Sequence, residues 1–305
     1  MTAFHHEAIF YDTDDEYVAG TVPEIRSTVT RDGAVLVAVG GAKRRLLGDA
    51  LGAEAERVRF IDMEALGRNP SCIIPAWREF LDDSGPQPVL GIGEPAWPGR
   101  SDAELVECSR HESLLNLAFG GGRPWRLLCP YDTGALAAGV LAEARRNHPY
   151  VRDHGSSDPS GEYGGRHAIL DRDDELPDPP RQPVELGFTD GDLALVRHFT
   201  SDHARGAGMR NDRVPDLVLA VHELVANSLR HGGGRGLLRM WAHDGMFVCE
   251  VVDAGHIADP LAGRGRRDVI GTSGRGLWIV NHLCDLVQMR STPRGTVVRL
   301  HMRLG

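Results

Sequence analysis

The stretch HELVANSLRH, at residues 222–231, decides how the C-terminal half of the chain is interpreted. It lies in a periodic apolar segment, Pro215–His231, that predicts one helix with a proline near its start and a glycine run after its end. The helical repeat puts Glu223, Asn227 and His231 on one side. Such a side is often only a solvated face. Beside a ligand, however, Asn227 would give Mg²⁺ an oxygen and Glu223 would act as a base or position a water.

Three later segments favour a ligand. In CEVVDAGH an apolar strand ends at Asp253, whose carboxylate can accept a hydrogen bond from an exocyclic amine, while Gly255 permits close approach of a base. GTSGRGLWIVNHLCD, at 271–285, is a glycine-rich loop entering an amphipathic helix, where backbone N–H groups attract phosphate. Residues 294–296, Arg-Gly-Thr, predict a hairpin turn between two strands. Each signal is weak alone.

In this order and spacing, the motifs ExxxN, DAG, GTSGRGL and GT resemble the GHKL superfamily, the ATP-binding domains of gyrase, Hsp90, histidine kinases and anti-sigma serine kinases. The resemblance covers about residues 185–305. It is closest to the anti-sigma regulatory serine kinase family, because the helix reads ELVANSLRH and the domain is short. It implies an α+β two-layer sandwich, the Bergerat ATP-binding fold. A helix-then-meander order of elements predicts the same class.

The resemblance also implies residue roles, with ATP and Mg²⁺ as cofactors. Glu223 would be the catalytic base and Asn227 the Mg²⁺ ligand. Asp253 would bind the adenine amine. The other implied nucleotide-binding positions are His231, Gly255 against the base, Gly271, Thr272, Ser273, Gly274 and Gly276 along the phosphates, Arg275, Leu277, and Thr296 supporting the adenine pocket.

Arginine has to meet the phosphate charge in this domain, because Lys43 is the only lysine of the chain and lies far upstream. Arg275, inside the glycine-rich loop, is the favoured candidate. For Arg264, Arg266 and Arg267, a phosphate contact and a solvated loop are equally good interpretations.

The first 150 residues follow a different pattern. Short apolar runs alternate with helical stretches, which predicts a mainly parallel sheet with helices on its faces. The apolar runs are Val35–Val39, Val58–Ile61, Val89–Ile92 and Leu127–Cys129, and the helical stretches are Lys43–Gly52, Ala103–Phe119 and Leu136–Asn147. After the first run, Gly40-Gly41-Ala42-Lys43-Arg44 lacks the hydroxyl residue and the glycine spacing of a phosphate-binding loop, so Lys43 is expected to be a helix-start cation.

Three phrases in this part are distinctive: GIGEPAWPGR, ECSRHESLLNLAF and LLCPYD. They resemble the MEDS domain, a sensory module of methanogen and methylotroph regulators, over about residues 5–150. The resemblance implies a three-layer α/β fold, a degenerate RecA-like domain. Cys108 and His111 could share a helix face as metal ligands, but a lone CxxH is expected to be structural.

The stretch 151–184 is rich in glycine, proline, serine and acidic residues, which predicts a solvated linker. The predicted domains are therefore 1–150, a MEDS-like sensory domain, and 185–305, an ATP-binding kinase domain. Within the second, helical patterns at Gly191–His203 and Pro215–His231 precede two strands, a loop, a helix near Arg275–Cys284, and two closing strands.

Composition narrows the classes of function. The net charge of −9 argues against direct binding to nucleic acid. No apolar run of the sequence is long enough for a membrane span. The N-terminus lacks the pattern of a secretion signal, and five cysteines without a CxxC pair suit reduced thiols. We therefore expect a cytoplasmic protein.

These observations lead to one main hypothesis and two alternatives. The main hypothesis is an ATP-dependent serine protein kinase that holds a sigma factor and phosphorylates a STAS-type anti-sigma factor antagonist. The kinase branch also implies a homodimer. One alternative is an anti-sigma adaptor that binds ATP without phosphate transfer, which would not need Glu223. The other is a histidine-kinase-like protein acting in trans, because no phosphorylatable dimerisation helix precedes residue 185.

Overall fold

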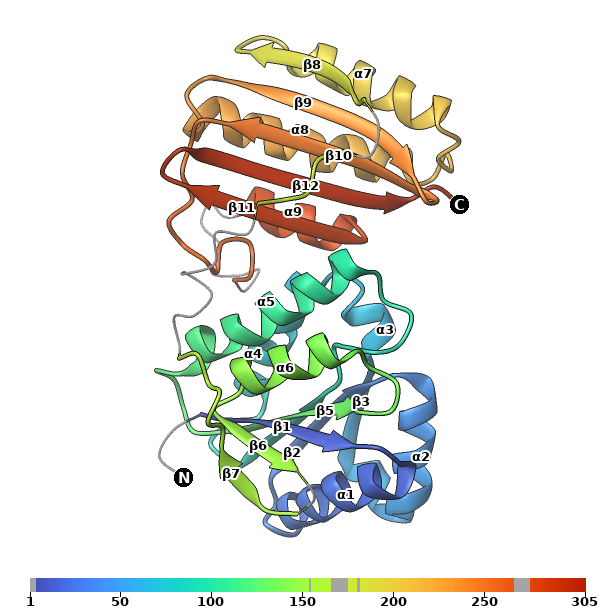
Figure 1. Ribbon diagram of the computed structural model, residues 1–305, viewed down its shortest axis with the longest axis vertical. Coiled ribbons are helices and arrows are strands. Elements are labelled where there is room, and N and C mark those ends of the chain that lie inside the picture. Colours follow the sequence, from blue (N-terminus) through green and yellow to red (C-terminus); the bar gives the residue numbers. More distant parts are fainter. Residues whose placement is uncertain (1–3, 154, 166–174, 180–181, 266–274) are drawn as a thin grey trace. The chain divides into compact units, whose positions relative to one another are not determined.

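The computed structural model describes the whole chain except residues 1–3, 154, 166–174, 180–181 and 266–274. The chain divides into two compact units, Met1–Arg172 and Asp173–Gly305, here called the N-terminal and C-terminal units. Figure 1 shows their helices and strands. Among the described residues, no helix combines the length and the apolar character needed to cross a membrane.

The N-terminal unit alternates strands and helices. In chain order its elements are β1 (His5–Tyr11), α1 (Asp14–Thr30), β2 (Ala34–Val39), α2 (Gly41–Leu51), the 3₁₀ helix η1 (Gly52–Arg57), β3 (Val58–Asp62), α3 (Met63–Leu66), the 3₁₀ helix η2 (Pro70–Cys72), α4 (Ile73–Asp83), β4 (Val89–Gly93), α5 (Asp102–Phe119), β5 (Arg126–Asp132), α6 (Ala138–Asn147), β6 (Tyr150–Asp153) and β7 (Ser157–Pro159).

These strands form one sheet in the order β3-β2-β4-β5-β1-β6-β7, in which only the β6–β7 pair is antiparallel. Helices α1 and α2 lie together on one face, and α4, α5 and α6 lie on the other (Figure 1). The central strands are buried on both faces, as a sheet covered on both sides requires. This confirms the predicted α/β fold with helices on both faces.

The sheet extends beyond the boundary expected at residue 150. Strand β7 and all but the first residue of β6 lie within 151–184, the stretch interpreted as a linker. The polar composition of this edge led to the prediction of a linker. In the structure these polar side chains are paired within the unit rather than solvated. The Arg152 guanidinium bonds Glu7 Oε1 at 3.0 Å and Glu24 Oε1 at 2.9 Å, and these partners are distant in sequence.

The C-terminal unit has a helical layer and an antiparallel sheet. Its elements are β8 (Val184–Thr189), α7 (Leu193–Gly206), α8 (Val214–His231), β9 (Arg235–His243), β10 (Met246–Asp253), α9 (Arg275–Leu283), β11 (Leu286–Thr292) and β12 (Gly295–Arg303). The strand order is β11-β12-β10-β9-β8. Helices α7, α8 and α9 lie side by side against one face of the sheet (Figure 1). The predicted two-layer α+β class is confirmed.

The core of this unit lies between α8 and the central strands. Leu217, Val221 and Leu224 are among the α8 side chains buried against the sheet, at the helical spacing seen in the sequence. The edge strand β8 was not predicted. Most of its residues are exposed or half-buried, so they lack the apolar run that marked the inner strands.

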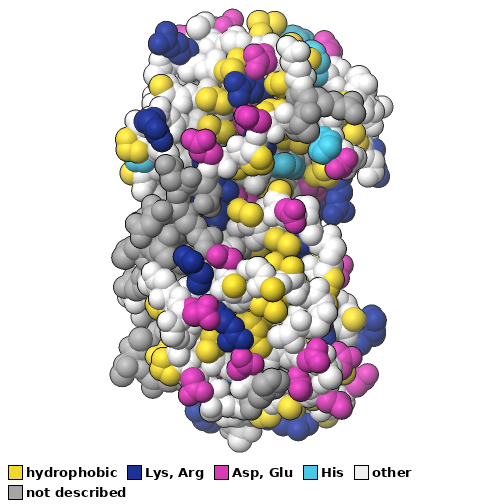
Figure 2. All heavy atoms as spheres, in the orientation of Figure 1, with side chains coloured by type: hydrophobic (Ala, Val, Ile, Leu, Met, Phe, Trp, Pro, Cys, Tyr) yellow, Lys and Arg dark blue, Asp and Glu magenta, His cyan; other side chains and the backbone are white. Residues whose placement is uncertain are grey.

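Opposite the helices, the sheet carries a polar network. Glu250 and Arg299 are both buried, and the Arg299 guanidinium donates to Glu250 Oε2 at 2.6 Å and to the Pro177 carbonyl at 2.8 Å. The chain around Pro177, expected to be solvated linker, is therefore tied to the sheet of the C-terminal unit. On the face drawn in Figure 2, acidic and basic side chains are interspersed over both units, so its charge is locally balanced.

Candidate functional site

Helix α8 presents Glu223 and Asn227 on the side away from its buried stripe. Pro215 lies in its first turn, where a missing N–H costs no hydrogen bond, and Gly232 ends it by donating its N–H to the Ser228 carbonyl. Both side chains are half-buried. Among the described residues, no hydrogen bond or ion pair involves the Glu223 carboxylate or the Asn227 carboxamide. Two polar groups are thus available to a ligand.

Gly276, the second residue of α9, packs directly against this pair. A Cβ built there would lie 2.8 Å from Glu223 Oε2 and 3.0 Å from Asn227 Nδ2. Every residue except glycine would displace these groups. The end of the glycine-rich loop therefore meets the ExxxN face of α8, as an anion site at a helix N-terminus requires.

Asp253 is the centre of a second cluster, at the end of β10. Its Oδ2 accepts a hydrogen bond from Ser228 Oγ at 2.5 Å, and its Oδ1 accepts one from the Gly255 N–H at 2.7 Å. Both donors orient the carboxylate. Because an ionised carboxylate has about four acceptor positions, it still has capacity for a further donor such as an amine.

Close backbone packing surrounds this carboxylate. A Cβ at Gly232 would lie 2.5 Å from Asp253 Cγ, and one at Gly255 would lie 2.8 Å from the His231 carbonyl oxygen. Glycine is therefore required at both positions. The DAG turn therefore packs closely against the end of α8, with the Asp253 carboxylate beside both glycines.

Thr296 joins the same cluster from β12. It stands opposite Asp253 in the β10–β12 ladder, and its hydroxyl donates to the Gly255 carbonyl at 2.9 Å. Ser291 Oγ lies 2.7 Å from Thr296 Oγ1 and accepts the Ile257 N–H at 2.7 Å. The GT motif thus fixes the turn after Asp253.

The structure brings most of the expected residues together, in two groups: Glu223, Asn227 and Gly276 around the start of α9, and Asp253, Gly255 and Thr296 around the end of β10. Arg275 is exposed at the start of α9 and Leu277 is half-buried. Expected residues outside the described residues are Gly271, Thr272, Ser273, Gly274, Arg266 and Arg267.

Two expected residues lie differently from the rest. The His231 side chain is exposed at the end of α8, and only its carbonyl packs against the DAG turn. Arg264 is buried rather than on an open loop face. Next to it, Gly263 adopts φ 74° and its carbonyl accepts the Asn281 side-chain amide at 3.1 Å, which ties the upstream loop to α9.

Ser228 and Ser291 were missed by the sequence analysis. Ser228 directly follows Asn227, but a serine in a helix is usually a neutral surface residue. Its function as a donor to Asp253 depends on a strand 25 positions away. The NS pair before a glycine run was the only available signal.

The donor set fits a magnesium nucleotide. Asn227 offers a neutral oxygen, of the kind that Mg²⁺ prefers, and Glu223 lies next to it at Gly276. Asp253 offers an oriented acceptor for an amine.

The N-terminal unit places its distinctive residues at the carboxyl ends of its strands. After β4, buried Glu94 accepts the Tyr11 hydroxyl at 2.7 Å, and burial raises the pKa of Glu94 to about 7. The Arg100 guanidinium stacks on Trp97, 3.5 Å from the ring centroid, and donates to the Gly67 carbonyl at 2.6 Å. Lys43, in α2, bonds Asp14 at 2.7 Å.

Family models match both units. Residues 5–149 match the MEDS model, the methanogen/methylotroph, DcmR sensory domain, and residues 188–302 match the histidine kinase-like ATPase domain. The chain therefore consists of an N-terminal MEDS domain and a C-terminal histidine kinase-like ATPase domain. A search of curated proteins gave no match.

Part of this chain is similar to several solved structures. The RsbU and RsbW domains of Rv1364c from Mycobacterium tuberculosis are 20% identical with a TM-score of 0.32, over 41% of this chain and 33% of that one. The histidine kinase AdeS from Acinetobacter baumannii is 14% identical with a TM-score of 0.26, over 41% and 69%. The ATPase domain of G40P is 9% identical with a TM-score of 0.31, over 49% and 68%. This chain spans a third of the length of the first structure.

Proposed function

We propose that this protein is an ATP-dependent anti-sigma regulatory kinase. Its C-terminal unit would bind Mg·ATP, phosphorylate a serine of a STAS-type anti-sigma factor antagonist and sequester a sigma factor, while the MEDS domain senses a signal. The observation that carries the proposal is the free Glu223 and Asn227 pair against Gly276, next to an Asp253 carboxylate oriented by two donors.

Adenine recognition is assigned to the Asp253 cluster. The carboxylate, held by Ser228 and the Gly255 N–H, accepts a hydrogen bond from the exocyclic amine. Gly255 has no side chain to obstruct the ring, and Thr296 fixes the Gly255 carbonyl. An orientation set before binding reduces the entropy lost on binding.

Phosphate and metal binding are assigned to the start of α9 and to α8. Bound Mg²⁺ would neutralise phosphate charge and orient the transferred group. Asn227 would hold the ion through its oxygen. Backbone N–H groups at the start of α9 and the exposed Arg275 would face the phosphates.

Glu223 is proposed as the base. In the transfer, the bond between the γ-phosphorus and the ADP oxygen breaks, and a bond from the acceptor serine oxygen to that phosphorus forms. The serine proton passes to the Glu223 carboxylate. This carboxylate has no partner among the described residues that would have to be displaced first.

The partners rest on the resemblance of ELVANSLRH and the short ATP-binding domain to anti-sigma regulatory serine kinases. That resemblance implies a sigma factor and its STAS-type antagonist as the two partners. A sensory MEDS domain on the same chain supports regulation by a signal that this domain detects.

Incubation of the full chain with γ-labelled ATP and candidate STAS-type proteins tests the proposal, with mass spectrometry locating the phosphate. We expect phosphoserine on one antagonist, together with sigma-factor binding in the presence of nucleotide. Phosphohistidine on a partner would instead support the histidine-kinase-like alternative. Sigma-factor binding without any transfer would support the adaptor.

A further inference from the structure

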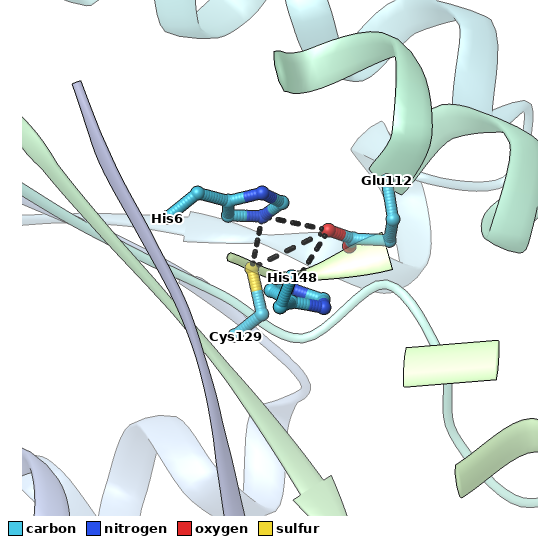
Figure 3. A group of neighbouring side chains, drawn as sticks. All are labelled: His6, Glu112, Cys129 and His148. Carbon is cyan, nitrogen blue, oxygen red and sulfur yellow. Dashed lines mark hydrogen bonds and ion pairs between the residues drawn. The ribbon is translucent and has the colours of Figure 1, made fainter. Parts of the chain in front are cut away.

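Four buried side chains converge in the N-terminal unit. His6 of β1, Glu112 of α5, Cys129 of β5 and His148 just before β6 each bring one ligand atom within 4.8 Å of the others (Figure 3). All four are at most 1% exposed. They come from four segments far apart in the sequence.

Four of the six distances between ligand atoms are close to the edges of a tetrahedron around a metal ion, and the other two are within 4.8 Å. Glu112 Oε2 lies 2.9 Å from His6 Nε2, 3.2 Å from His148 Nε2 and 3.6 Å from Cys129 Sγ, and Cys129 Sγ lies 3.5 Å from His6 Nε2. Zinc bonds of about 2.0–2.3 Å place neighbouring ligands about 3.3–3.6 Å apart in tetrahedral geometry.

The hydrogen bonds of the two imidazoles show which ring nitrogens face the cluster with a lone pair. His148 Nδ1 lies 2.7 Å from the Ala144 carbonyl oxygen, which can only accept, so Nδ1 carries the proton. In a neutral ring, Nε2 is then an acceptor. His148 Nε2 lies 3.2 Å from Glu112 Oε2, but the described residues offer this nitrogen no hydrogen bond of good geometry.

The contacts of Asn116 show which nitrogen of His6 carries the proton. The Asn116 amide nitrogen donates to the Asn147 carbonyl at 2.7 Å, which orients the Asn116 oxygen toward His6 Nδ1 at 3.0 Å. His6 Nδ1 is therefore the donor. Its Nε2 lone pair also faces Glu112 Oε2, so two imidazole lone pairs meet one carboxylate.

A cation at the centre would satisfy this arrangement of acceptors. Without one, either an imidazole or the Glu112 carboxyl must carry an extra proton, and a single proton cannot separate both imidazole lone pairs from the carboxyl oxygen. A divalent ion balances one thiolate and one carboxylate, and the two imidazoles stay neutral. The outward Nδ1–H bonds to an amide and a carbonyl oxygen are the supporting contacts typical of metal-bound histidines.

We propose that His6, Glu112, Cys129 and His148 bind one zinc ion. The mixture of two nitrogens, one sulfur and one oxygen suits Zn²⁺ better than the oxygen-preferring Mg²⁺ or Ca²⁺. The site is closed and fully buried, so the ion is structural. It joins α5 to β1, β5 and the chain entering β6.

The nearby CxxH pair is not part of this group. Cys108 Sγ donates instead to the Pro95 carbonyl at 3.2 Å. Cys108 is equally buried and also lies on α5, so Cys108→Ser is a matched control for Cys129→Ser.

The test uses the untagged full chain, analysed for metal by mass spectrometry as isolated and again after chelation and titration with Zn²⁺ or Co²⁺ alone. We expect about one zinc per chain, a cobalt–thiolate charge-transfer band, and a higher melting temperature on metal addition. Cys129→Ser and His148→Gln should each lose most of the bound metal, whereas Cys108→Ser should keep it.

A wild-type chain that holds no zinc and takes up neither ion after chelation would overturn the proposal, as would full zinc binding by both ligand variants. Should the variants fail to fold, X-ray absorption at the zinc edge of the wild-type chain decides. One sulfur and three nitrogen or oxygen neighbours support the site, and any other sulfur count contradicts it.

Discussion

Ser228 Oγ donates a hydrogen bond to Asp253 Oδ2 at 2.5 Å, which joins the middle of the last two turns of α8 to the end of β10. The bond links the helix that carries Glu223 and Asn227 to the carboxylate proposed to bind adenine. The Ser228 hydroxyl therefore connects the helix with the proposed metal ligand to the strand with the proposed adenine acceptor.

Ser228→Ala should weaken ATP binding although Ser228 touches no proposed phosphate or metal group. Loss of a hydrogen bond to a charged group is worth roughly 1.5–3 kcal/mol, about 10- to 150-fold in affinity if it acts wholly on the site. Calorimetry on the full chain measures this. Thr200→Val removes a buried α7 hydroxyl that has no hydrogen-bond partner, so this control should bind ATP normally. Equal affinities for both variants would contradict the proposed role of Ser228.

Asp253→Asn should lower ATP affinity by a similar factor, about 10- to 150-fold, and leave the fold intact. The asparagine oxygen can still accept the Gly255 N–H, and its amide can face Ser228, whose hydroxyl can turn to the Leu224 carbonyl 3.2 Å away. The substitution replaces one carboxylate oxygen by an amide nitrogen, so the acceptor proposed for the adenine amine is lost. GTP titrations serve as the comparison, since guanine has no exocyclic amine at that position. An unchanged ATP affinity would remove Asp253 from the site.

Glu223→Gln and Asn227→Ala should separate chemistry from binding. The glutamine keeps size and polarity but cannot take the serine proton, so single-turnover phosphorylation should fall about 10²- to 10⁴-fold while ATP binding persists. Asn227→Ala removes the proposed Mg²⁺ ligand and should reduce binding and transfer together. Transfer by Glu223→Gln at the wild-type rate would show that another group is the base.

Gly276→Ala should damage the site through sterics alone. The new Cβ would overlap the ends of Glu223 and Asn227, which can swing away, so stability should change little while their geometry is lost. Overpacking of this kind costs roughly 1–3 kcal/mol, here expected as about a 5- to 150-fold loss of ATP affinity. The matched control is Gly206→Ala in α7, where a Cβ meets nothing within 4 Å. Parallel titrations that show equal losses would argue against a specific packing role.

Glu94 should make the N-terminal unit less stable as the pH rises. Burial raises its pKa from 4.5 to about 7, so the folded chain binds this proton more tightly than the unfolded chain does. The contribution is fully present below pH 4.5 and is lost as the pH rises through 7, by up to about 3 kcal/mol. Hydrogen exchange of β1 in the full chain, from pH 4.5 to 8, should show this loss in the wild type and in the exposed control Glu56→Gln, but not in Glu94→Gln. A parallel decline in Glu94→Gln would assign it to other groups.

Local patterns predicted the parts of the fold that carry their own signal. Helix α8, strands β9 and β10, and the start of α9 follow the apolar periodicity to within about two residues. Glu223, Asn227, Asp253 and Gly276 could be singled out because they lie in short motifs in a fixed order. Their roles in catalysis and binding stay predictions.

Features that depend on pairing across the chain could not be predicted. Strand β1 begins with His5, His6 and Glu7, and the last two are fully buried, against the usual preference of such residues for the surface. Only their partners in β5, β6 and α5 make that burial favourable. The cluster of His6, Glu112, Cys129 and His148 could not be predicted for the same reason, because its members meet only in the folded sheet. Sequence spacing indicated Cys108 and His111 instead.

The position of β1 between β5 and β6 has a consequence for how the chain folds during synthesis. His6 meets Cys129 across 123 positions, so β1 has neither of its partner strands until most of the N-terminal unit has left the ribosome. Such non-local pairing is slow, and the waiting strand edge is exposed to aggregation. The C-terminal unit, in which β9 meets β10 through a tight turn, begins from local contacts. We therefore expect the N-terminal unit to complete its sheet late in synthesis and in one step. This step would occur when β5 and β6 leave the ribosome and pair with the two edges of β1.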